Sequence, residues 1–303
     1  RRYNRASVGA PWQPSHAATM GGMDDPPDDA ADDAAGEPAA PDPHDEFPVG
    51  FFRRADEADD AEFYEPDRFV AHIDDRAIEA VGRLYRRLGI DGGGSARRVL
   101  DLMASWISHF LIAPPELVVL GMNERELRSN RQASSYVVHD LNASARLPFP
   151  DGHFDAATCC VSIDYLVRPI DVLREVARVV TPGGPVVCTF SNRCFPTKVI
   201  RGWLAITEQQ RCHTVGQYFR LAGGYTEPQA MLCTPPNTAG DPLYAVWANV
   251  VDDAADGGGV EPQPGSQRSL PITCLLGQAQ RPLGASLRLG VLASRGLEAR
   301  AQL

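Results

Sequence analysis

The sequence predicts an α/β fold: a doubly wound, mostly parallel sheet of seven strands with an antiparallel hairpin at one edge. Short apolar segments alternate with amphipathic segments of helical period between residues 72 and 225, which is typical of strand–helix–strand units. The last two apolar segments, residues 229–235 and 242–250, are too close for an intervening helix, so we expect them to pair antiparallel. The 303 residues suffice for one such domain with a tail at each end.

The two ends of the chain differ in composition from its centre. Residues 24–46 hold ten Asp and Glu and no Lys or Arg, which equals the net charge of −10 of the whole chain. Such a segment buries too little apolar surface to fold, so residues 1–46 are predicted to be a disordered acidic tail, with order beginning near Phe47 or Phe63. Residues 252–303 lack periodicity, which predicts a second disordered or aberrant tail. The folded domain is expected to span residues 60–250.

Composition argues against several classes of partner and site. The chain shows no basic stripe for nucleic acid, no polybasic membrane anchor and no apolar run long enough to span a bilayer. The seven Cys form no C-x-x-C pair and no His spacing typical of zinc, so we expect a reducing compartment and no structural metal. The first 23 residues contain Arg and Ser but no acid, as in the end of an organelle transit peptide or in a biased tail. The expected location is the cytoplasm or an organelle stroma or matrix.

The first helix of the domain is predicted over residues 72–88. Its apolar side chains follow the helical period: Ile78, Val81, Leu84, Tyr85 and Leu88. Asp74 is the expected N-cap, and Ile73 and Ile78 are spaced as a hydrophobic staple. Gly89 ends the helix.

Strands and helices then follow one another along the chain. Buried parallel strands are predicted over residues 97–103, 116–122, 135–141, 155–163 and 185–190, each a short apolar run. Helices are predicted over residues 105–113, 124–130, 169–180 and 215–225. Pro114 and Pro115 should end the helix over residues 105–113. The adjacent Cys159 and Cys160 should point to opposite faces of their strand.

Each parallel strand is followed by polar side chains. In an open parallel sheet, ligands bind beyond the carboxyl ends of the strands, where the strand order reverses, so these positions predict a ligand site. The positions are Asp101, Ala104, Ser105 and Trp106; Asn123 and Glu124; Asp140, Leu141 and Asn142; Ser162, Asp164 and Tyr165; and Ser191, Asn192 and Arg193.

Four segments carry a resemblance to a known family: VLDLMASWISHF, VVLGMNERELRSN, VVHDLNASARLPFPDGHFD and LREVARVVTPGGPVVCTFSN. Together they resemble class I S-adenosylmethionine-dependent methyltransferases of the type 11 kind, most specifically in the loop LPFPDGHFD and the turn RVVTPGG. FVAHIDDRAI, SWISH, GMNE and FSNRCF are more narrowly similar to a methyltransferase-like subgroup. The resemblance covers roughly residues 60–250. It implies a Rossmann-like sheet, S-adenosylmethionine as the cofactor and a small molecule as the methyl acceptor.

The resemblance implies that Asp101 and the loop after it approach the methionine part of the cofactor. The usual glycine-rich loop is absent, and Ala104 and Ser105 are the smallest substitutes for residues that let a backbone approach a ligand closely. The hydroxyls of Ser105 and Ser108, with the free amides of a helix start, are expected to hold the cofactor carboxylate. Trp106 is expected to pack behind the loop or to cover the cofactor.

The same resemblance places the ribose and adenine at the next two strands. Asn123 sits where an acid normally holds the ribose hydroxyls, 22 residues after Asp101, and Glu124 stands beside it. An amide lacks charge assistance, so weaker cofactor binding is predicted. Asp140 matches the acid that reaches the adenine amino group, and Leu141 supplies a backbone contact.

The methyl group and the acceptor are expected to meet at residues 162–165, which include Ser162. A base is needed only if the acceptor must lose a proton, and the candidates are His72, Asp164, Tyr165 and His109. Each has a structural alternative. His72 could help to cap the first helix, Asp164 could cap a turn, Tyr165 could form a wall, and His109 could pack within a helix.

Two other functions compete with an active methyltransferase. A catalytically silent protein of the same fold, acting by binding or interaction, is favoured by the missing glycines and by Asn123. The retained Asp101 and Asp140 favour the enzyme. A nicotinamide oxidoreductase is the weakest alternative, because a pyrophosphate would need the glycine-rich loop even more.

Overall fold

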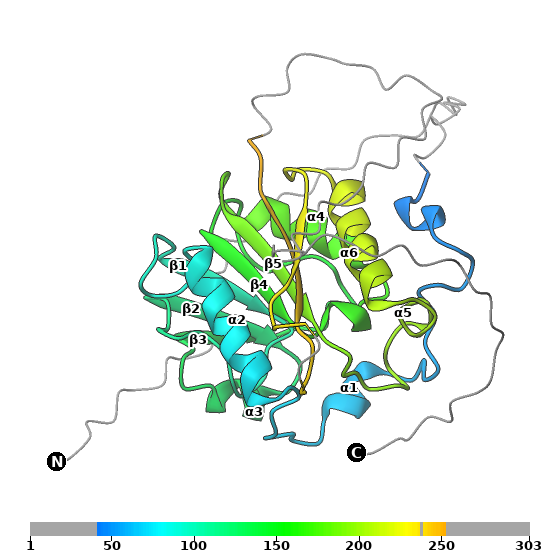
Figure 1. The fold of residues 1–303 in the computed structure, drawn as a ribbon, viewed down its shortest axis with the longest axis horizontal. Coiled ribbons are helices and arrows are strands. Elements are labelled where there is room, and N and C mark those ends of the chain that lie inside the picture. Colours follow the sequence, from blue (N-terminus) through cyan, green and yellow to red (C-terminus); the bar gives the residue numbers. More distant parts are fainter. Residues whose placement is uncertain (1–40, 237–238, 253–303) are drawn as a thin grey trace, which may run out of the picture.

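The protein was analysed as a computed structural model, which describes residues 41–236 and 239–252. Its centre is a seven-stranded sheet in the order β3-β2-β1-β4-β5-β7-β6 (Figure 1). Strands β1 to β5 pair in parallel, whereas β7 pairs antiparallel with β5 and with β6. The strands are β1 Arg98–Leu102, β2 Glu116–Gly121, β3 Ser135–Val138, β4 Ala156–Cys160, β5 Pro185–Phe190, β6 Gln229–Leu232 and β7 Tyr244–Asn249. The predicted fold class is confirmed, including its antiparallel edge.

Helices pack against both faces of this sheet. On one face, α2 (Asp75–Arg87) and α3 (Glu124–Ser129) share a buried apolar cluster with alternate residues of β1 and β2. On the other face, α4 (Pro169–Val179) and α6 (Glu208–Ala222) share a second cluster with the intervening residues. Cys159 belongs to the α4 cluster and Cys160 packs against the α2 cluster, so their predicted opposite orientation is confirmed.

The helix predicted over residues 72–88 is present as α2. Asp74 is its N-cap, because the Asp74 carboxylate accepts a hydrogen bond of 2.9 Å from the amide of Ala77. Ile73 is buried in the cluster against which Ile78 packs, in agreement with the predicted staple. Gly89 follows the helix at a φ of 71°, which only glycine adopts without strain.

The helix predicted over residues 105–113 is wrong, because the crossover from β1 to β2 is irregular. Side chains replace the hydrogen bonds that a helix would make. Gln132 accepts from the amide of Phe110 at 3.3 Å and donates to its carbonyl at 2.8 Å, while the Ser108 hydroxyl donates to Asp101. Leu111 and Ile112 remain 47% and 51% exposed. These contacts outweigh a weak helical preference in a short crossover.

Four short helical segments were not predicted: η1 Pro43–Glu46, α1 Asp60–Tyr64, η2 Ile163–Tyr165 and α5 Arg201–Leu204. The helix α6 also begins seven residues before the predicted start, because Thr207 and Gln210 form a capping box there. η1 and the buried His44 lie within the last part of the expected acidic tail. The rest of that tail, and residues 253–303 of the second one, lie outside the described residues.

The loop LPFPDGHFD is fastened to α4 by Arg178. The guanidinium donates to the carbonyl of Phe149 at 2.9 Å and to that of Leu147 at 3.1 Å, and it pairs with Asp151 and Glu175 at 2.7 Å each. Although burial raises the pKa of Glu175, the contacts with Arg178, the Leu147 amide and Arg146 together outweigh it and hold that pKa below its usual value. The family-like loop is therefore held by a planar, charge-assisted fork.

Arg178→Lys is expected to lower the free energy of unfolding by about 2 kcal/mol, because an ammonium cannot reproduce the fork and leaves carbonyl acceptors unpaired. Arg174→Lys on the same helix is the matched control. Arg174 is 53% exposed and pairs only with Asp171 and, weakly, with one carbonyl, so a change of no more than about 0.5 kcal/mol is expected. Urea unfolding measures both variants. Equal losses of unfolding free energy in the two variants would show that the Arg178 fork does not stabilise the fold more than the exposed ion pair of Arg174 does.

Residues 54–70, called the strap below, lie across the carboxyl ends of the parallel strands. In Figure 1 the chain leading into them runs from beside α6, past α5, to α1 at the lower end of the molecule. Phe47, Phe51 and Phe52, just before the strap, pack around one another and against α6. The strap thus covers the edge of the sheet at which the sequence predicts a ligand site.

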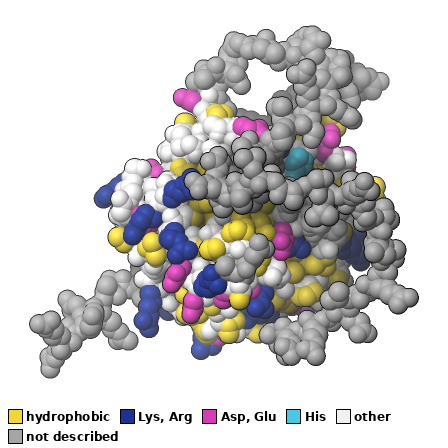
Figure 2. Space-filling model, viewed as in Figure 1, with side chains coloured by type: hydrophobic (Ala, Val, Ile, Leu, Met, Phe, Trp, Pro, Cys, Tyr) yellow, Lys and Arg dark blue, Asp and Glu magenta, His cyan; other side chains and the backbone are white. Residues whose placement is uncertain are grey.

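The surface does not separate charge by sign. On the face seen in Figure 2, Lys and Arg side chains on the side of α2 are interspersed with Asp, Glu and apolar side chains. Arg83 and Glu79, for example, form an exposed pair at 3.2 Å on α2. Among the helices of the described residues, none has the length and apolar character to cross a membrane.

Candidate active site at the carboxyl ends of the strands

The strand order reverses between β1 and β4, which are adjacent in the sheet and are followed by loops at the same edge. Two residues there have an unusual backbone. Met103 after β1 has a φ of 52° and Val161 after β4 has a φ of 47°, and among the described residues they are the only ones besides glycine with positive φ. This left-handed region is costly for bulky and β-branched side chains, and such strain clusters at functional sites.

Asp101 lies inside the sheet and not on its surface. Its side chain is 4% exposed and accepts from the hydroxyls of Ser108 at 2.7 Å and Thr158 at 2.8 Å. Burial raises the pKa of Asp101 to about 6, although these two hydrogen bonds oppose the shift. The carboxylate therefore holds the loop after β1 by way of Ser108.

The expected hydroxyls of that loop already have protein partners. Ser105 donates to Glu126 of α3, and Ser108 donates to Asp101 while accepting from Asn130 at 2.9 Å. By contrast, none of the backbone amides of residues 105–109 has an acceptor within the described residues. The loop can thus offer amide groups to an anion, as the predicted helix start would have done, but without a helix.

Ala104 and Trp106 hold the loop against its neighbours. The amide of Ala104 donates to the carbonyl of Leu120 at 2.8 Å, and a side chain at Gly121 would come within 2.2 Å of the Ala104 carbonyl oxygen. Trp106 donates from its indole nitrogen to the carbonyl of Val70 at 3.2 Å and packs edge-on against a neighbouring ring. Trp106 therefore joins the loop to the strap.

A shallow cavity of about 620 Å³ lies beside this loop. Its walls come from the crossover and from the turn after α3: Phe69, Trp106, Ile107, Ser108, Ser129, Asn130, Arg131 and Gln132. The predicted positions after β2, β3 and β4 do not line it, so we do not place the cofactor there.

Asn123 is the N-cap of α3, and both polar atoms of its side chain have protein partners. Its side-chain oxygen accepts from the amide of Glu126 at 3.0 Å. Its amide group donates to the carbonyls of Tyr64 and Glu65, each at 3.0 Å, and lies 3.3 Å from a carboxylate oxygen of Asp67. Glu124, the expected substitute, instead accepts from the Tyr136 hydroxyl at 2.9 Å. The residue at the predicted ribose position is therefore bound to the strap.

Asp140 retains one free carboxylate oxygen. Its Oδ1 accepts from the amides of Asn142 at 2.8 Å and Ala143 at 3.3 Å, which makes a turn directly after β3. Within the described residues, neither the Asp140 Oδ2 nor the amide of the buried Leu141 has a hydrogen-bond partner. An acceptor and a donor thus stand side by side where the adenine is predicted.

The residues after β4 provide the predicted acceptor side. Ser162 donates to the carbonyl of Cys160 at 2.9 Å. Asp164 is 2% exposed, and burial raises the pKa of its carboxyl to about 7. The Tyr165 hydroxyl accepts from the amide of Phe195 at 2.8 Å, and burial raises the pKa of Tyr165 well above its usual value. Among these, Asp164 has the pKa suited to a proton acceptor near neutral pH.

Two histidines stand at the same edge. The exposed His72 packs edge-on against Phe195 with 5.3 Å between ring centroids, and partial desolvation lowers its pKa. His109 lies in the irregular crossover, where burial and the nearby His72 lower its pKa to about 4. The Nδ1 of His109 is buried without a partner in the described residues. Both side chains are neutral at neutral pH.

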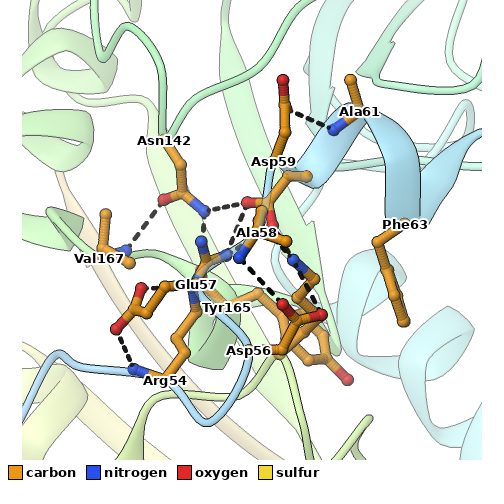
Figure 3. A network of polar contacts seen from close by, with 12 residues as sticks. Arg54, Asp56, Glu57, Ala58, Asp59, Ala61, Phe63, Asn142, Tyr165 and Val167 are labelled. Carbon is orange, nitrogen blue, oxygen red and sulfur yellow. Dashed lines mark hydrogen bonds and ion pairs between the residues drawn. The ribbon is translucent and has the colours of Figure 1, made fainter.

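A buried charge network fastens the strap and was missed by sequence reasoning (Figure 3). Arg54 contacts both oxygens of Asp60 at 2.6 and 2.7 Å, and Lys198 donates to the carbonyl of Ala58 at 2.7 Å and lies 3.1 Å from Asp60. Asn142 adds a hydrogen bond of 2.9 Å to Asp60. These residues are far apart in sequence and follow no short motif, so no local pattern identifies them.

The cofactor implied by the resemblance can be tested against these residues. The free amides of residues 105–109 suit a carboxylate, and Asp140 with the Leu141 amide suits an adenine edge. At the ribose position, the amide hydrogens of Asn123 become available only if Asn123 gives up its bonds to the strap. No group of three His, Cys, Asp or Glu within the described ranges is placed to hold a metal ion.

Comparisons with known proteins agree with this geometry. Residues 103–188 match the model of a methyltransferase domain family. The chain is 32% identical over 116 residues to the ubiquinone/menaquinone biosynthesis C-methyltransferase UbiE of Pseudomonas fluorescens, covering 34% of this chain and 45% of that protein. For the Yersinia enterocolitica protein of the same name, the identity is 34% over 121 residues, with 34% and 47% covered. The chain thus spans about half the length of the curated relatives that it matches.

Solved structures of similar proteins include a methyltransferase from Aquifex aeolicus that is described as dependent on S-adenosylmethionine. It is 14% identical, with a TM-score of 0.41, and 63% of this chain and 97% of that one are covered. One from Archaeoglobus fulgidus is 15% identical, with a TM-score of 0.41 and coverage of 57% and 94%. The matched residues begin directly after β1 and end within β5, so this part of the chain carries a methyltransferase domain of type 11.

Proposed function

We propose that this protein transfers a methyl group from S-adenosylmethionine to a small-molecule acceptor at the carboxyl ends of β1 to β5. The observation that carries the proposal is the pair of strained residues, Met103 and Val161, at the two strands that flank the reversal of strand order. Strain of this kind is retained where the backbone must approach a ligand. When bound, the cofactor would supply a methyl group already activated on a sulfonium.

The chain's own residues would then position the reactants. The amides of residues 105–109 would hold the methionine carboxylate, and Asp140 with Leu141 would hold the adenine. His72, Tyr165 and Phe195 would form an aromatic wall for the acceptor, and alignment of acceptor and methyl group supplies much of the acceleration. Asp164 would accept a proton where the acceptor must lose one, with His72 as the alternative base.

A small acceptor is supported by the aromatic character of this wall and by the relatives. The curated relatives are named as C-methyltransferases of ubiquinone/menaquinone biosynthesis. A second candidate function, a silent binding protein, is favoured by one observation: both amide hydrogens of Asn123 are engaged by the strap.

Calorimetric titration of the full chain tests the proposal. We expect S-adenosylmethionine and its demethylated product to bind, and Asp140→Asn to weaken binding about tenfold, because a charge-assisted hydrogen bond contributes about 1.5–3 kcal/mol. Asparagine keeps an oxygen for the turn and loses only the free acceptor, so stability should not change. Asp75→Asn, on the exposed side of α2, is the matched control. If the folded wild-type protein gives no binding heat with either ligand, the catalytically silent protein becomes the favoured function.

A further inference from the structure

The strap forms hydrogen bonds with the segments that follow four of the five parallel strands. Its carbonyls and carboxylates accept from Trp106 after β1, Asn123 after β2, Asn142 after β3 and Lys198 after β5. Asn142 also joins it to the segment after β4, through the carbonyl of Tyr165 at 3.0 Å. A segment in this position stands between solvent and the candidate active site.

The two halves of the strap are fastened very differently. The first half is held by Asp60, which is 5% exposed and contacts both Arg54 and Lys198. Although burial raises the pKa of Asp60, the contacts with Arg54, Asn142 and Lys198 together outweigh it, and the net shift is downward. Removing one partner of such a buried group is strongly destabilising, so this half is an anchor.

The second half, residues 64–70, is held by hydrogen bonds of its backbone to Trp106, Asn123 and the buried Glu126, and by one ion pair at the surface. Its ion pair joins Asp67 to Arg125, whose side chain is 77% exposed, and exposed pairs contribute no more than about 1 kcal/mol. Phe69 and Val70 are 43% and 56% exposed. This half can therefore lift while the first half stays in place.

Asn123 is the point at which the lifting half and the cofactor meet. A side-chain amide has two hydrogens, and both point to carbonyls of the strap, those of Tyr64 and Glu65. Its oxygen is taken by the cap of α3. Neither hydrogen of the Asn123 amide is left for a ribose oxygen while residues 64–67 are in place.

We infer that residues 64–70 and the ribose of the cofactor compete for the amide of Asn123, so that this half of the strap is a gate that opens before the cofactor binds. The inference rests on the proposed function. It also explains why an amide stands at a position where a carboxylate is usual in the family. A carboxylate would face two carbonyl oxygens and Asp67, and it would repel the strap.

The competition predicts the effect of two substitutions. Asn123→Asp keeps the N-cap of α3, since Asp and Asn cap equally well, but it expels the strap and gains a charged acceptor for the ribose. We expect S-adenosylmethionine to bind at least about tenfold more tightly. Asp67→Ala removes the ion pair with Arg125 and the 3.3 Å contact with Asn123 but leaves the two carbonyls of the gate in place, and we expect the association rate to rise about threefold. In the Asn123→Asp background, Asp67→Ala should add nothing.

The experiment uses the full chain, with calorimetry for affinity and stopped-flow tryptophan fluorescence for the association rate. Glu79→Gln, which removes an exposed acid of α2 away from the strap, is the matched control. If wild type binds and both variants bind equally well and equally fast, the gate is overturned and the proposed function stands. Tighter binding by Asn123→Asp with no effect of Asp67→Ala would reflect charge alone and would also overturn the gate.

Failure of the proposed function has a different signature. If wild type and both variants fold but none binds S-adenosylmethionine, the proposed function fails and the competition fails with it. If wild type gives no heat and the variants bind, the gate is supported in its strongest form, because the strap then keeps the wild-type site closed.

Discussion

Asp164→Asn is expected to raise the free energy of unfolding by about 2–3 kcal/mol near pH 8 and to leave it almost unchanged near pH 4. The Asp164 side chain is 2% exposed, and burial raises its pKa from 3.8 to about 7. A carboxyl with a raised pKa in the folded state stabilises the fold while it is protonated. That contribution is complete below pH 3.8 and is lost as the pH rises through about 7. Asparagine stays neutral at every pH, so the Asp164→Asn variant does not lose this stability as the pH rises.

Urea unfolding of both proteins between about pH 4 and about pH 8 measures this difference. Asp75→Asn, at an exposed acid, should shift stability by no more than about 0.5 kcal/mol at any of these pH values. A stability difference that does not vary with pH would show that Asp164 is not a buried, shifted carboxyl. If Asp164 takes a proton from the acceptor, the stabilised variant should also transfer methyl groups more slowly, which is a stability cost retained for activity.

Gly121→Ala is expected to lower the free energy of unfolding by about 2–4 kcal/mol and to weaken S-adenosylmethionine binding by more than about tenfold. Gly121 is the last residue of β2, and an added Cβ would lie 2.2 Å from the carbonyl oxygen of Ala104. The obstacle is backbone that also donates to Leu120 through the Ala104 amide, so it cannot move without shifting the loop after β1.

Gly93→Ala is the matched control for this substitution. An added Cβ there would meet a side-chain oxygen of Asp91 at 3.3 Å and a methyl group of Ile112 at 3.9 Å, both of which can yield. We expect a change of no more than about 1 kcal/mol and unaltered binding. Thermal unfolding and calorimetry measure the pair of variants. Similar behaviour of the two alanines would show that the close approach of β2 to the loop has no functional importance.

The sheet could be predicted from the sequence because its signals are local. Each strand is a short apolar run between polar ends, and the gap between residues 235 and 242 is too short for a helix. The cap at Asp74 and the helical period of α2 are likewise local. The prediction of a helix in the crossover after β1 was wrong for the opposite reason, because the contacts that shape this crossover are not local. Gln132, far along the chain, holds both polar groups of Phe110, and no window around residue 110 contains that information.

The sequence predicted where the candidate site residues lie, but not which hydrogen-bond partners they have in the fold. The positions after the strands do meet at one edge of the sheet, as parallel topology requires. The sequence could not indicate that the Ser105 hydroxyl and the Asn123 amide are engaged, since their partners are Glu126 and the strap. Lys198 and Asp60 belong to no motif and are brought together only by the fold. What each candidate side chain can still bind therefore depends on tertiary contacts.

The irregular crossover has a consequence for how the protein exchanges its amide hydrogens with water. Residues 105–109 follow β1, a strand with paired neighbours on both sides, yet their five amides have no acceptor within the described residues. Their exchange is governed by local access and needs no unfolding, whereas the adjacent strand exchanges only through large openings. A map of exchange rates should show five fast amides immediately after slow ones. A ligand carboxylate that binds this loop would slow that exchange. The exchange rates of the amides of residues 105–109 would therefore report ligand binding directly.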